Sequence, residues 1–564
     1  MDLSEYIKKS RVDNVLLKHG PRPKSYGTIA LTSHHFIFQP SPSQNSINGR
    51  DDELWLLLRA VDIAVSEATM MNKGILTLKC KNFMICSFEM EKPHDALLLV
   101  QSINALSNLK SPGHEFPYFY RSPFTVLDDG WNIYDVSQQF CELSTMFPDI
   151  FRLSSVNKDY HVCSSYPDKS IVVKGVGDDY LRLCATFRRD GRFPVVSFVD
   201  YSTKSVLVRT SEPLLGPTNR RCIEDEAVHK AYLLNKNMGI LIDTRSKTAL
   251  ASAKARGGGY ESAFYYRSWN IIFLELPRAQ DIQTSFHKVV ETCNDYGNVN
   301  FHSRLNASGW LPTIATILSK AGVIAQSMHY VNPGYTHIVH GGESKDMTLM
   351  MTSLCALILD PNARTLRGFQ SLIEREWILG GHPFGERCSH SAYATGGGEE
   401  APIFVCFLNC VFQMMHAYPT AFEFTDHFLI NIFEHSYASE FGTFLYDNER
   451  DRCHAQLRKK TVSLWSYVNH PDILSTFMNP LYVPLGQPLW PVISGVIHVL
   501  WQRLFLRWNL TWDEADETSA IAAATAEKVK KLQSQLRTLL NQRSRINSGQ
   551  TIAVEEMSNL TIDG

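Results

Sequence analysis

The 564-residue sequence has no excess of charge of either sign, because 55 Lys and Arg residues against 57 Asp and Glu residues leave a formal net charge of −2. It therefore lacks the overall basic field that attracts nucleic acid or an anionic membrane, and an anionic partner has to be held locally. Residues 1–9 lack the apolar run of a secretory signal, so we expect a soluble, cytoplasmic protein. The most apolar stretch, 401–418, contains Asn409, Gln413 and His416 and predicts a buried amphipathic helix, not a membrane span.

Signatures of metal, nucleotide and disulfide chemistry are also missing. The 12 cysteines are scattered, and only Cys406 and Cys410 stand at helical spacing, inside a Phe- and Val-rich run that favours core packing over a zinc site. The glycines at 257–259 lack the last Gly of the dinucleotide fingerprint, and Gly341-Gly342 is not followed by the Gly-Lys-Ser/Thr of a P-loop. We therefore expect no metal ion, no cofactor and, in the cytosol, no disulfide.

With 44% hydrophobic residues, the chain is long and apolar enough for two folded domains and a tail. Short β-rich runs alternate with polar turns between residues 27 and 88. A helix then begins at Pro93, and its apolar residues recur every three or four positions, at Ala96, Leu99, Val100, Ile103 and Leu106. A small sheet closed by one C-terminal helix is the outline of a pleckstrin-homology-like module at 1–110. The alternative is an N-terminal extension of the main sheet.

Residues 111–135 form a proline- and aromatic-rich connector, which predicts an ordered linker packed on the next domain. From 136 to 510 the sequence mixes strand-like and helix-like stretches without an internal repeat, as expected of a main α/β domain. Its candidate buried strands are 193–198, 239–243 and 337–339, and its best helix candidates are 347–359 and 369–378.

The last part of the chain changes character after Trp512. Over 513–547 acidic residues come first and basic residues later, which suits the dipole of one long helix. A narrow stripe at heptad spacing predicts a coiled coil that needs a second chain, with core positions Val529, Leu532, Leu536, Leu539, Arg543 and Ile546. In a homodimer two Arg543 side chains would meet, so the stripe favours a different partner. The alternative is a helix folded back on its own domain, and we expect 548–564 to be disordered.

One loop connects an apolar strand-like stretch to a strongly apolar helix-like stretch. It comprises His340, Gly341, Gly342, Glu343, Ser344, Lys345, Asp346 and Met347. A loop between a strand and a helix N-terminus directs backbone N–H groups toward one point, where a phosphate can sit. Glu343 places a carboxylate near the mouth of this cradle and repels a phosphate dianion, a repulsion that Lys345 can offset.

Several separated motifs occur together in the main domain. They are Phe187–Pro194, Ile242–Arg245, Lys254–Glu261, Arg364–Phe369, Glu374–Trp377 and Gly380–Phe384. With these motifs the chain resembles the myotubularins over nearly its whole length, and its N-terminal segment resembles their lipid-binding PH-GRAM domain. The resemblance implies an α/β Cys-phosphatase-like domain that follows a small β-rich PH-GRAM domain and precedes a C-terminal coiled-coil helix.

Active myotubularins resemble other Cys phosphatases in carrying His-Cys-Ser-Asp-Gly-Trp-Asp-Arg at this loop. Laid on that pattern, His340 and Asp346 match, whereas Gly341 replaces the nucleophilic Cys and Met347 replaces the phosphate-binding Arg. Glycine has no group that attacks phosphorus, and methionine neither donates hydrogen bonds nor carries charge. Loss of a covalent nucleophile alone typically costs about a factor of 10⁶ in turnover. We therefore predict no catalytic residue, as in inactive family members whose coiled coil pairs with active relatives.

Two other thiols are weak candidates for a replacement nucleophile. Cys355 falls about two helical turns beyond Met347 on an apolar face, which predicts a core position. Cys388 follows Glu386 and Arg387 and could be exposed, but no phosphate cradle surrounds it.

Three functions are compatible with these observations. In the first, the chain is a regulatory subunit that binds an active myotubularin-family phosphatase through its coiled coil. The resemblance implies that such pairing stabilises and activates the partner on endosomal or other intracellular membranes, and so influences phosphatidylinositol 3-phosphate levels and endocytic traffic. The second is an active phosphoinositide phosphatase with a non-standard mechanism. The third is a phosphoinositide-binding membrane adaptor that acts through its N-terminal module.

Overall fold

The chain divides into two units, Met1–Trp508 and Asn509–Gly564. The computed structural model describes residues 3–20, 24–41, 53–109, 111–234, 236–295, 300–393, 399–492, 498–508, 528, 529, 531, 532, 534, 535 and 538. None of the described helices is long and apolar enough to cross a membrane.

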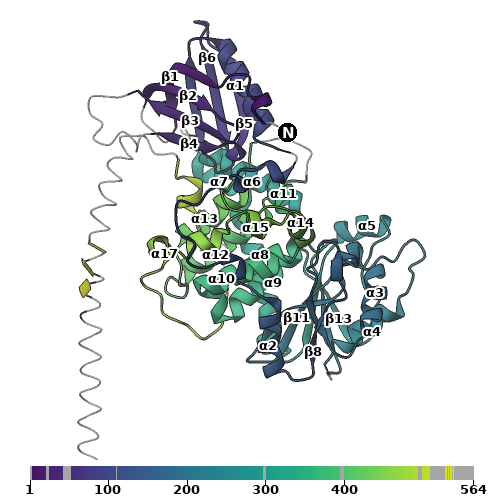
Figure 1. Cartoon of the computed structure of the whole chain (residues 1–564). Coiled ribbons are helices and arrows are strands. Elements are labelled where there is room, and N and C mark those ends of the chain that lie inside the picture. Colours follow the sequence, from purple (N-terminus) through teal and green to yellow (C-terminus); the bar gives the residue numbers. More distant parts are fainter. Residues whose placement is uncertain are drawn as a thin grey trace, which may run out of the picture. The chain divides into compact units, whose positions relative to one another are not determined.

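The N-terminal module is an antiparallel sheet closed by one helix (Figure 1). Its strand order is β4-β3-β2-β1-β7-β6-β5, with β1 (Arg11–His19), β2 (Ser25–Leu31), β3 (His35–Pro40), β4 (Leu54–Leu57), β5 (Val61–Ala68), β6 (Gly74–Cys80) and β7 (Ile85–Met90). Helix α1 (Pro93–Leu106) buries Ala96, Leu99 and Ile103 in the same core cluster as the strands. This sheet is separate from the main one, so the alternative of an extension of the main sheet is wrong.

The main domain is built on a five-stranded sheet of order β10-β11-β14-β12-β13. All neighbours in it are parallel except β10 and β11. The strands are β10 (Val195–Asp200), β11 (Ser205–Arg209), β12 (Gly239–Asp243), β13 (Trp269–Phe273) and β14 (Thr336–His340), and β8 (Phe151–Ser154) pairs separately with β9 (Ser170–Val173). The central strand, β14, is buried along its whole length because its neighbours and the helices cover both faces.

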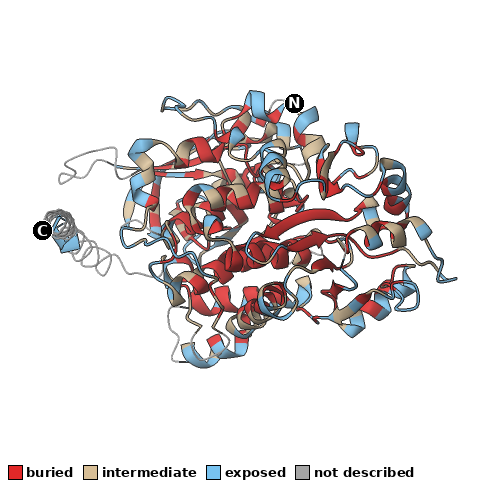
Figure 2. Cartoon of the chain, turned by 90° about the horizontal axis from the view of Figure 1, so that it is seen from below, coloured by how far each residue is buried: buried red, intermediate tan, exposed pale blue. Residues whose placement is uncertain are grey.

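Helices surround this sheet and form most of the core (Figure 2). They are α2 (Val136–Met146), α3 (Asp178–Phe187), α4 (Ile223–Ala231), α5 (Lys247–Ala255), α6 (Ala279–Cys293), α7 (Phe301–Ser308), α8 (Trp310–Gln326), α9 (Met347–Leu359), α10 (Leu366–Ile373), α11 (Phe384–Arg387), α12 (Ile403–Ala417), α13 (Asp426–Tyr437), α14 (Glu449–His454), α15 (Leu457–Lys460), α16 (Leu464–Val468), α17 (Pro471–Phe477) and α18 (Gln502–Phe505). Helices α8, α9 and α12 contact one another. The apolar run at 401–418 is therefore a buried helix, as predicted.

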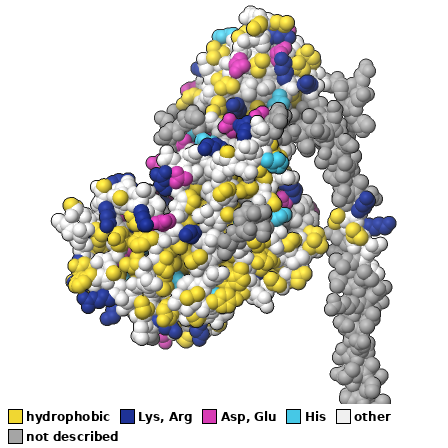
Figure 3. Space-filling view, turned by 180° about the vertical axis from the view of Figure 1, so that it is seen from behind, with side chains coloured by type: hydrophobic (Ala, Val, Ile, Leu, Met, Phe, Trp, Pro, Cys, Tyr) yellow, Lys and Arg dark blue, Asp and Glu magenta, His cyan; other side chains and the backbone are white. Residues whose placement is uncertain are grey.

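The segment at 111–135 lies against the main domain. Its Trp131 indole N–H donates to the carbonyl of Thr461 at 3.3 Å, and the hydroxyl groups of Tyr118 and Tyr446 are 2.9 Å apart. The surface seen in Figure 3 mixes basic, acidic and apolar side chains. This mixture agrees with the nearly neutral charge of the chain.

The turn between β6 and β7 joins the N-terminal module to the main domain. Phe83 in this turn is buried and packs its ring against Phe286, Phe433 and Phe505 of the main domain. The carbonyl of Asn82 beside it accepts the indole N–H of Trp508 at 2.9 Å. An aromatic side chain of one module is thus part of the core of the other.

The coiled-coil stripe falls largely outside the described residues. Val529 and Leu532 are helical, and their side chains are exposed. Leu536, Leu539, Arg543 and Ile546 lie outside the described residues, as does 541–564.

Replacing Phe83 by Ala should destabilise the chain by about 3–5 kcal/mol, because the large ring leaves a cavity among three aromatic neighbours. Urea unfolding of the full chain measures this loss. Met71→Ala is the matched control, since Met71 is exposed at the tip of the β5–β6 turn and should change stability by less than about 0.5 kcal/mol. Equal effects of the two substitutions would contradict the packing role of Phe83.

Candidate functional site

The loop at 340–347 lies at the carboxyl edge of the main sheet. Strand β14 ends at His340, and α9 begins at Met347. Because β11 and β12 run parallel to β14 on either side, their carboxyl ends open toward the same edge. In open α/β sheets ligands bind outside this edge. The strand, loop and helix therefore have the arrangement that the sequence predicts.

His340 is held by a buried ionic network beneath the loop. Its Nε2 lies 2.9 Å from Oε2 of Glu261, whose other oxygen accepts from Nη1 of Arg188 at 2.6 Å. Arg188 in turn pairs with Asp225 at 2.6 Å. Burial alone would lower the pKa of His340 and raise that of Glu261. The attraction between the two charges outweighs the effect of burial on both groups. The pKa of His340 is therefore raised, and that of Glu261 is held well below its ordinary value.

A side chain of the loop accepts a hydrogen bond from the loop's own backbone. The Gly341 N–H donates to Oγ of Ser344 at 3.0 Å, so a group that could face a phosphate is already bonded inside the loop. Ser344 is buried, and its φ of +60° turns the chain back toward Gly341. Its carbonyl accepts from Nη2 of Arg192 at 2.9 Å. The Gly342 carbonyl accepts the N–H of Glu212 at 3.0 Å.

The charged side chains of the loop pair with residues around it. Asp346 lies 3.1 Å from Nδ1 of His382 and 3.0 Å from Nη2 of Arg387. Burial would raise the pKa of Asp346, but these two partners hold it well below its ordinary value. Lys345 pairs with Asp190 at 2.7 Å and lies 3.6 Å from Glu343. The lysine is therefore shared between two carboxylates, and an anion would have to compete with both of them for it.

A buried carboxylate that the sequence reasoning missed lies beside the loop. Glu212 accepts from Nε of Arg189 at 2.5 Å and pairs through its other oxygen with Arg245. A Cβ on Gly258 would lie 2.4 Å from this carboxylate, so only glycine admits it there. The glycine cluster at 257–259 thus lets the backbone approach Glu212 closely. Its partners Arg189 and Arg245 stand in the motifs Phe187–Pro194 and Ile242–Arg245, and this was the available signal.

Neither alternative thiol is placed to act as a nucleophile. Cys355 is buried in α9, as predicted. The expectation that Cys388 could be exposed is wrong, because its exposed fraction is 3% and burial raises the pKa of its thiol to about 12. A buried thiol with a raised pKa is unreactive.

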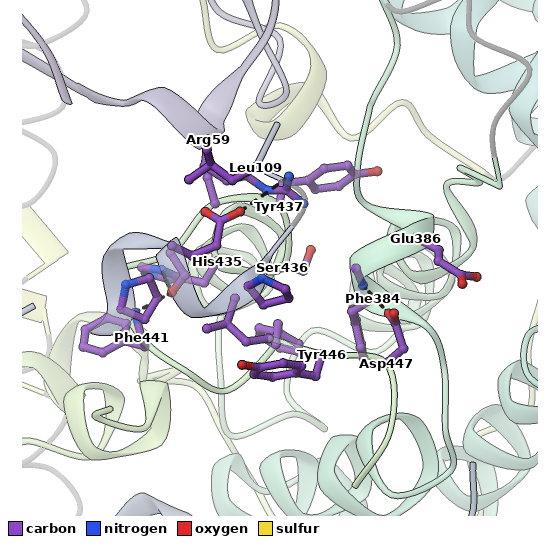
Figure 4. A pocket seen from close by; sticks show the side chains of 18 of the residues that line it. Arg59, Leu109, Phe384, Glu386, His435, Ser436, Tyr437, Phe441, Tyr446 and Asp447 are labelled. Carbon is purple, nitrogen blue, oxygen red and sulfur yellow. Dashed lines mark hydrogen bonds and ion pairs between the residues drawn. The ribbon is translucent and has the colours of Figure 1, made fainter. Parts of the chain in front are cut away.

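A cavity of about 480 Å³ opens where the N-terminal module meets the main domain. Figure 4 shows Arg59 reaching toward it from the module, with Tyr446 and Asp447 on the facing wall. Arg59 is paired with Glu115 at 3.7 Å, and three further carboxylates line the cavity. This balance of charge opposes an anionic lipid headgroup. Within the described ranges no group of three or more His, Cys, Asp or Glu side chains is arranged to hold a metal ion.

Comparison with known proteins gives the chain its family. The model of the myotubularin-like phosphatase domain matches residues 115–453, and that of the MTMR6-9 GRAM domain matches residues 11–107. The chain belongs to the myotubularin family. It is 44% identical over 519 residues to myotubularin-related protein 9 of Caenorhabditis elegans, covering 90% of this chain and 91% of that protein.

Two further relatives are also similar to this myotubularin. The myotubularin-related protein 9 of Homo sapiens is 41% identical over 545 residues, covering 96% of this chain and 97% of that protein. The phosphatidylinositol-3,5-bisphosphate 3-phosphatase MTMR2 of Gallus gallus is 32% identical over 494 residues, covering 86% and 84%. These matches confirm the fold inferred from the sequence, an N-terminal GRAM domain followed by a myotubularin phosphatase domain.

The charge pair beneath the loop makes the stability of this myotubularin depend on pH. The pKa of His340 is raised in the folded state, so its contribution is complete below the ordinary histidine pKa of about 6.5 and is lost as the pH rises through the raised value. His340→Gln should therefore destabilise the chain more at pH 6 than at pH 9, as measured by urea unfolding. The exposed His94, replaced by Gln, is the control and should show no such difference. A His340→Gln effect that grows with pH would contradict the ion pair.

Proposed function

We propose that this chain is a regulatory subunit without catalytic activity of its own, and that it binds and activates a catalytically competent myotubularin. The observation that carries this proposal is the content of the loop at 340–347. Gly341 and Met347 stand where the family pattern has its nucleophile and its phosphate-binding guanidinium. The fold that presents the loop is retained, but the two groups that do the chemistry are not.

The surroundings of the loop support the same proposal. Arg189 and Arg245, two of the arginines near it, both donate to Glu212. A phosphate dianion at the loop would meet the negative charges of Glu212 and Glu343 and a lysine already shared between two carboxylates. The charges around this site would therefore oppose the negative charge of a phosphoryl transition state, whereas active sites usually stabilise it.

The space at position 341 has adapted to glycine. A Cβ placed on Gly341 would lie 2.7 Å from Oγ1 of Thr244 and 3.4 Å from Oγ1 of Thr348. Because real Cβ atoms do not approach a neighbour to 2.7 Å, a cysteine here requires the Thr244 side chain to move.

Two features support the proposed partner: the family of this chain and the heptad stripe near its C-terminus. The relative named above as a phosphatidylinositol-3,5-bisphosphate 3-phosphatase shows that catalysts of this class share the fold of this chain. We propose that an enzyme of this class pairs with the stripe that begins at Val529 and Leu532. In this proposal the GRAM domain contributes contact with endosomal or other intracellular membranes, and the complex thereby influences phosphatidylinositol 3-phosphate levels and endocytic traffic.

The isolated chain, freed of partners, should release no phosphate above a buffer control from phosphatidylinositol 3-phosphate or 3,5-bisphosphate. The double variant Gly341→Cys with Met347→Arg should stay at the same background, because Thr244 and Glu212 still obstruct the site. Malachite-green phosphate release measures both proteins, with an active myotubularin as the positive control. Turnover by the wild-type chain would contradict the proposal, and turnover by the double variant alone would contradict the obstruction.

Co-purification with an active myotubularin tests the proposed interface. Leu532→Asp together with Leu536→Asp should weaken the complex by about 100-fold or more, since each buried leucine contributes roughly 1.5–3 kcal/mol. Ser534→Asp with Thr538→Asp is the matched control, because both residues are helical and lie off the heptad stripe. Unchanged co-purification of the leucine variant would remove the basis of the proposed interface.

A further inference from the structure

A second cavity, of about 330 Å³, lies on the phosphatase domain and shares no lining residue with the loop. Three separate segments form its apolar wall: Trp131 from the linker, Ile378 and Leu379 from the turn after α10, and Leu457 from α15. Small-molecule sites typically measure about 300–1,000 Å³ and combine an apolar wall with a few polar groups. The cavity has the size and the wall of such a site.

One polar group of this cavity is a buried cation with an unused donor. Arg452 is 7% exposed, and its Nη1 and Nη2 donate to the carbonyls of Thr443 at 2.9 Å and Tyr446 at 3.4 Å. Its Nε–H has no hydrogen-bond partner among the described residues. Burial lowers the pKa of Arg452 to about 10, although the charges of Glu374 and Asp447 oppose this shift.

The carboxyl groups of the cavity are engaged elsewhere. Glu374 accepts the indole N–H of Trp465 at 2.7 Å, and Glu449 accepts the N–H of Asp168 at 3.1 Å. Burial raises the pKa of both carboxyl groups.

The rim adds two more cations and a thiol. Arg458 and Lys459 of α15 line the cavity and are exposed to solvent. Cys453 of α14 also lines it and is exposed, and the hydroxyl of Tyr160 donates to its sulfur at 3.2 Å. An apolar chain inside the cavity can thus keep a negatively charged head within reach of the rim.

We propose that this cavity binds an amphipathic anion, with one short apolar chain against Trp131, Leu379 and Leu457 and a carboxylate or phosphate head at Arg458 and Lys459. The head can belong to a free fatty acid or to a single-chain phospholipid. This site is separate from the partner-binding role proposed above, since neither the loop nor the coiled-coil stripe lines it.

Thiol labelling of the full-length chain tests the proposal directly. Cys453 stands at the cavity and Cys141 on α2, and these two cysteines are exposed while the other ten are buried or half-buried. Saturating decanoate, or lysophosphatidate below its micelle concentration, should slow maleimide labelling of Cys453 by about fivefold or more, because only the unoccupied fraction reacts. Labelling of Cys141, followed by peptide mass spectrometry in the same sample, should not change.

The two ligands and a neutral analogue distinguish the outcomes. Protection by decanoate alone would identify the head of the ligand as the carboxylate of a fatty acid. Protection by lysophosphatidate alone would identify it as a lipid phosphate. Protection by neither ligand, or equal protection of Cys453 and Cys141, would overturn the proposal. Equal protection by decanol, the neutral analogue, would contradict the proposal that the ligand has an anionic head.

Variants of the rim and of the wall complete the test. Arg458→Gln with Lys459→Gln should raise the ligand concentration for half-protection about tenfold, because both charges near the head are lost. Lys460→Gln is the matched control, since Lys460 is exposed on the same helix and does not line the cavity. Leu379→Trp should fill the cavity and abolish protection. Full protection of the filled variant, or equal effects of the rim and control variants, would contradict the site.

Discussion

The proposed loss of phosphate binding at the loop 340–347 depends on one interaction, the carboxylate of Glu212 held between the guanidinium groups of Arg189 and Arg245. A buried charge has to be paired, and the partners of this one are Arg189 and Arg245. Because the carboxylate fills the space that Gly258 leaves open, the arrangement is part of the packing and not a surface contact. An incoming phosphate would have to compete with the Glu212 carboxylate for these two arginines.

The architecture of a phosphatase site survives here because it also holds the domain together. His340, Glu261 and Arg188 form a buried network that fixes the end of the central strand, and Asp346 ties the start of α9 to His382 and Arg387. These pairs are needed for folding whether or not a nucleophile stands between them, since removing one partner leaves a buried charge. A chain with glycine at 341 and methionine at 347 can thus keep the loop and its surroundings.

The sequence predicted the parts whose signal is local. The bounds 239–243 and 347–359 match β12 and α9 because both are apolar runs with clear ends. Strand β1 went unnoticed, since its buried residues alternate with exposed ones and it contains a bulge. The bond from Gly341 to Ser344 and the position of Glu212 depend on segments far apart in the chain, and no spacing rule reveals them. Cys388 was misjudged because its charged neighbours Glu386 and Arg387 suggested a surface turn, whereas the fold buries its thiol.

Binding of a soluble headgroup to the loop tests the proposed loss of the anion site most directly, because it does not depend on catalysis. Isothermal titration of inositol 1,3-bisphosphate into the full-length chain, freed of partners, measures it. The structure predicts no saturable binding, since Ser344 occupies the Gly341 N–H and Glu212 occupies the neighbouring arginines. Saturable binding that Lys345→Ala weakens would show that the loop still accepts phosphate and would contradict the account.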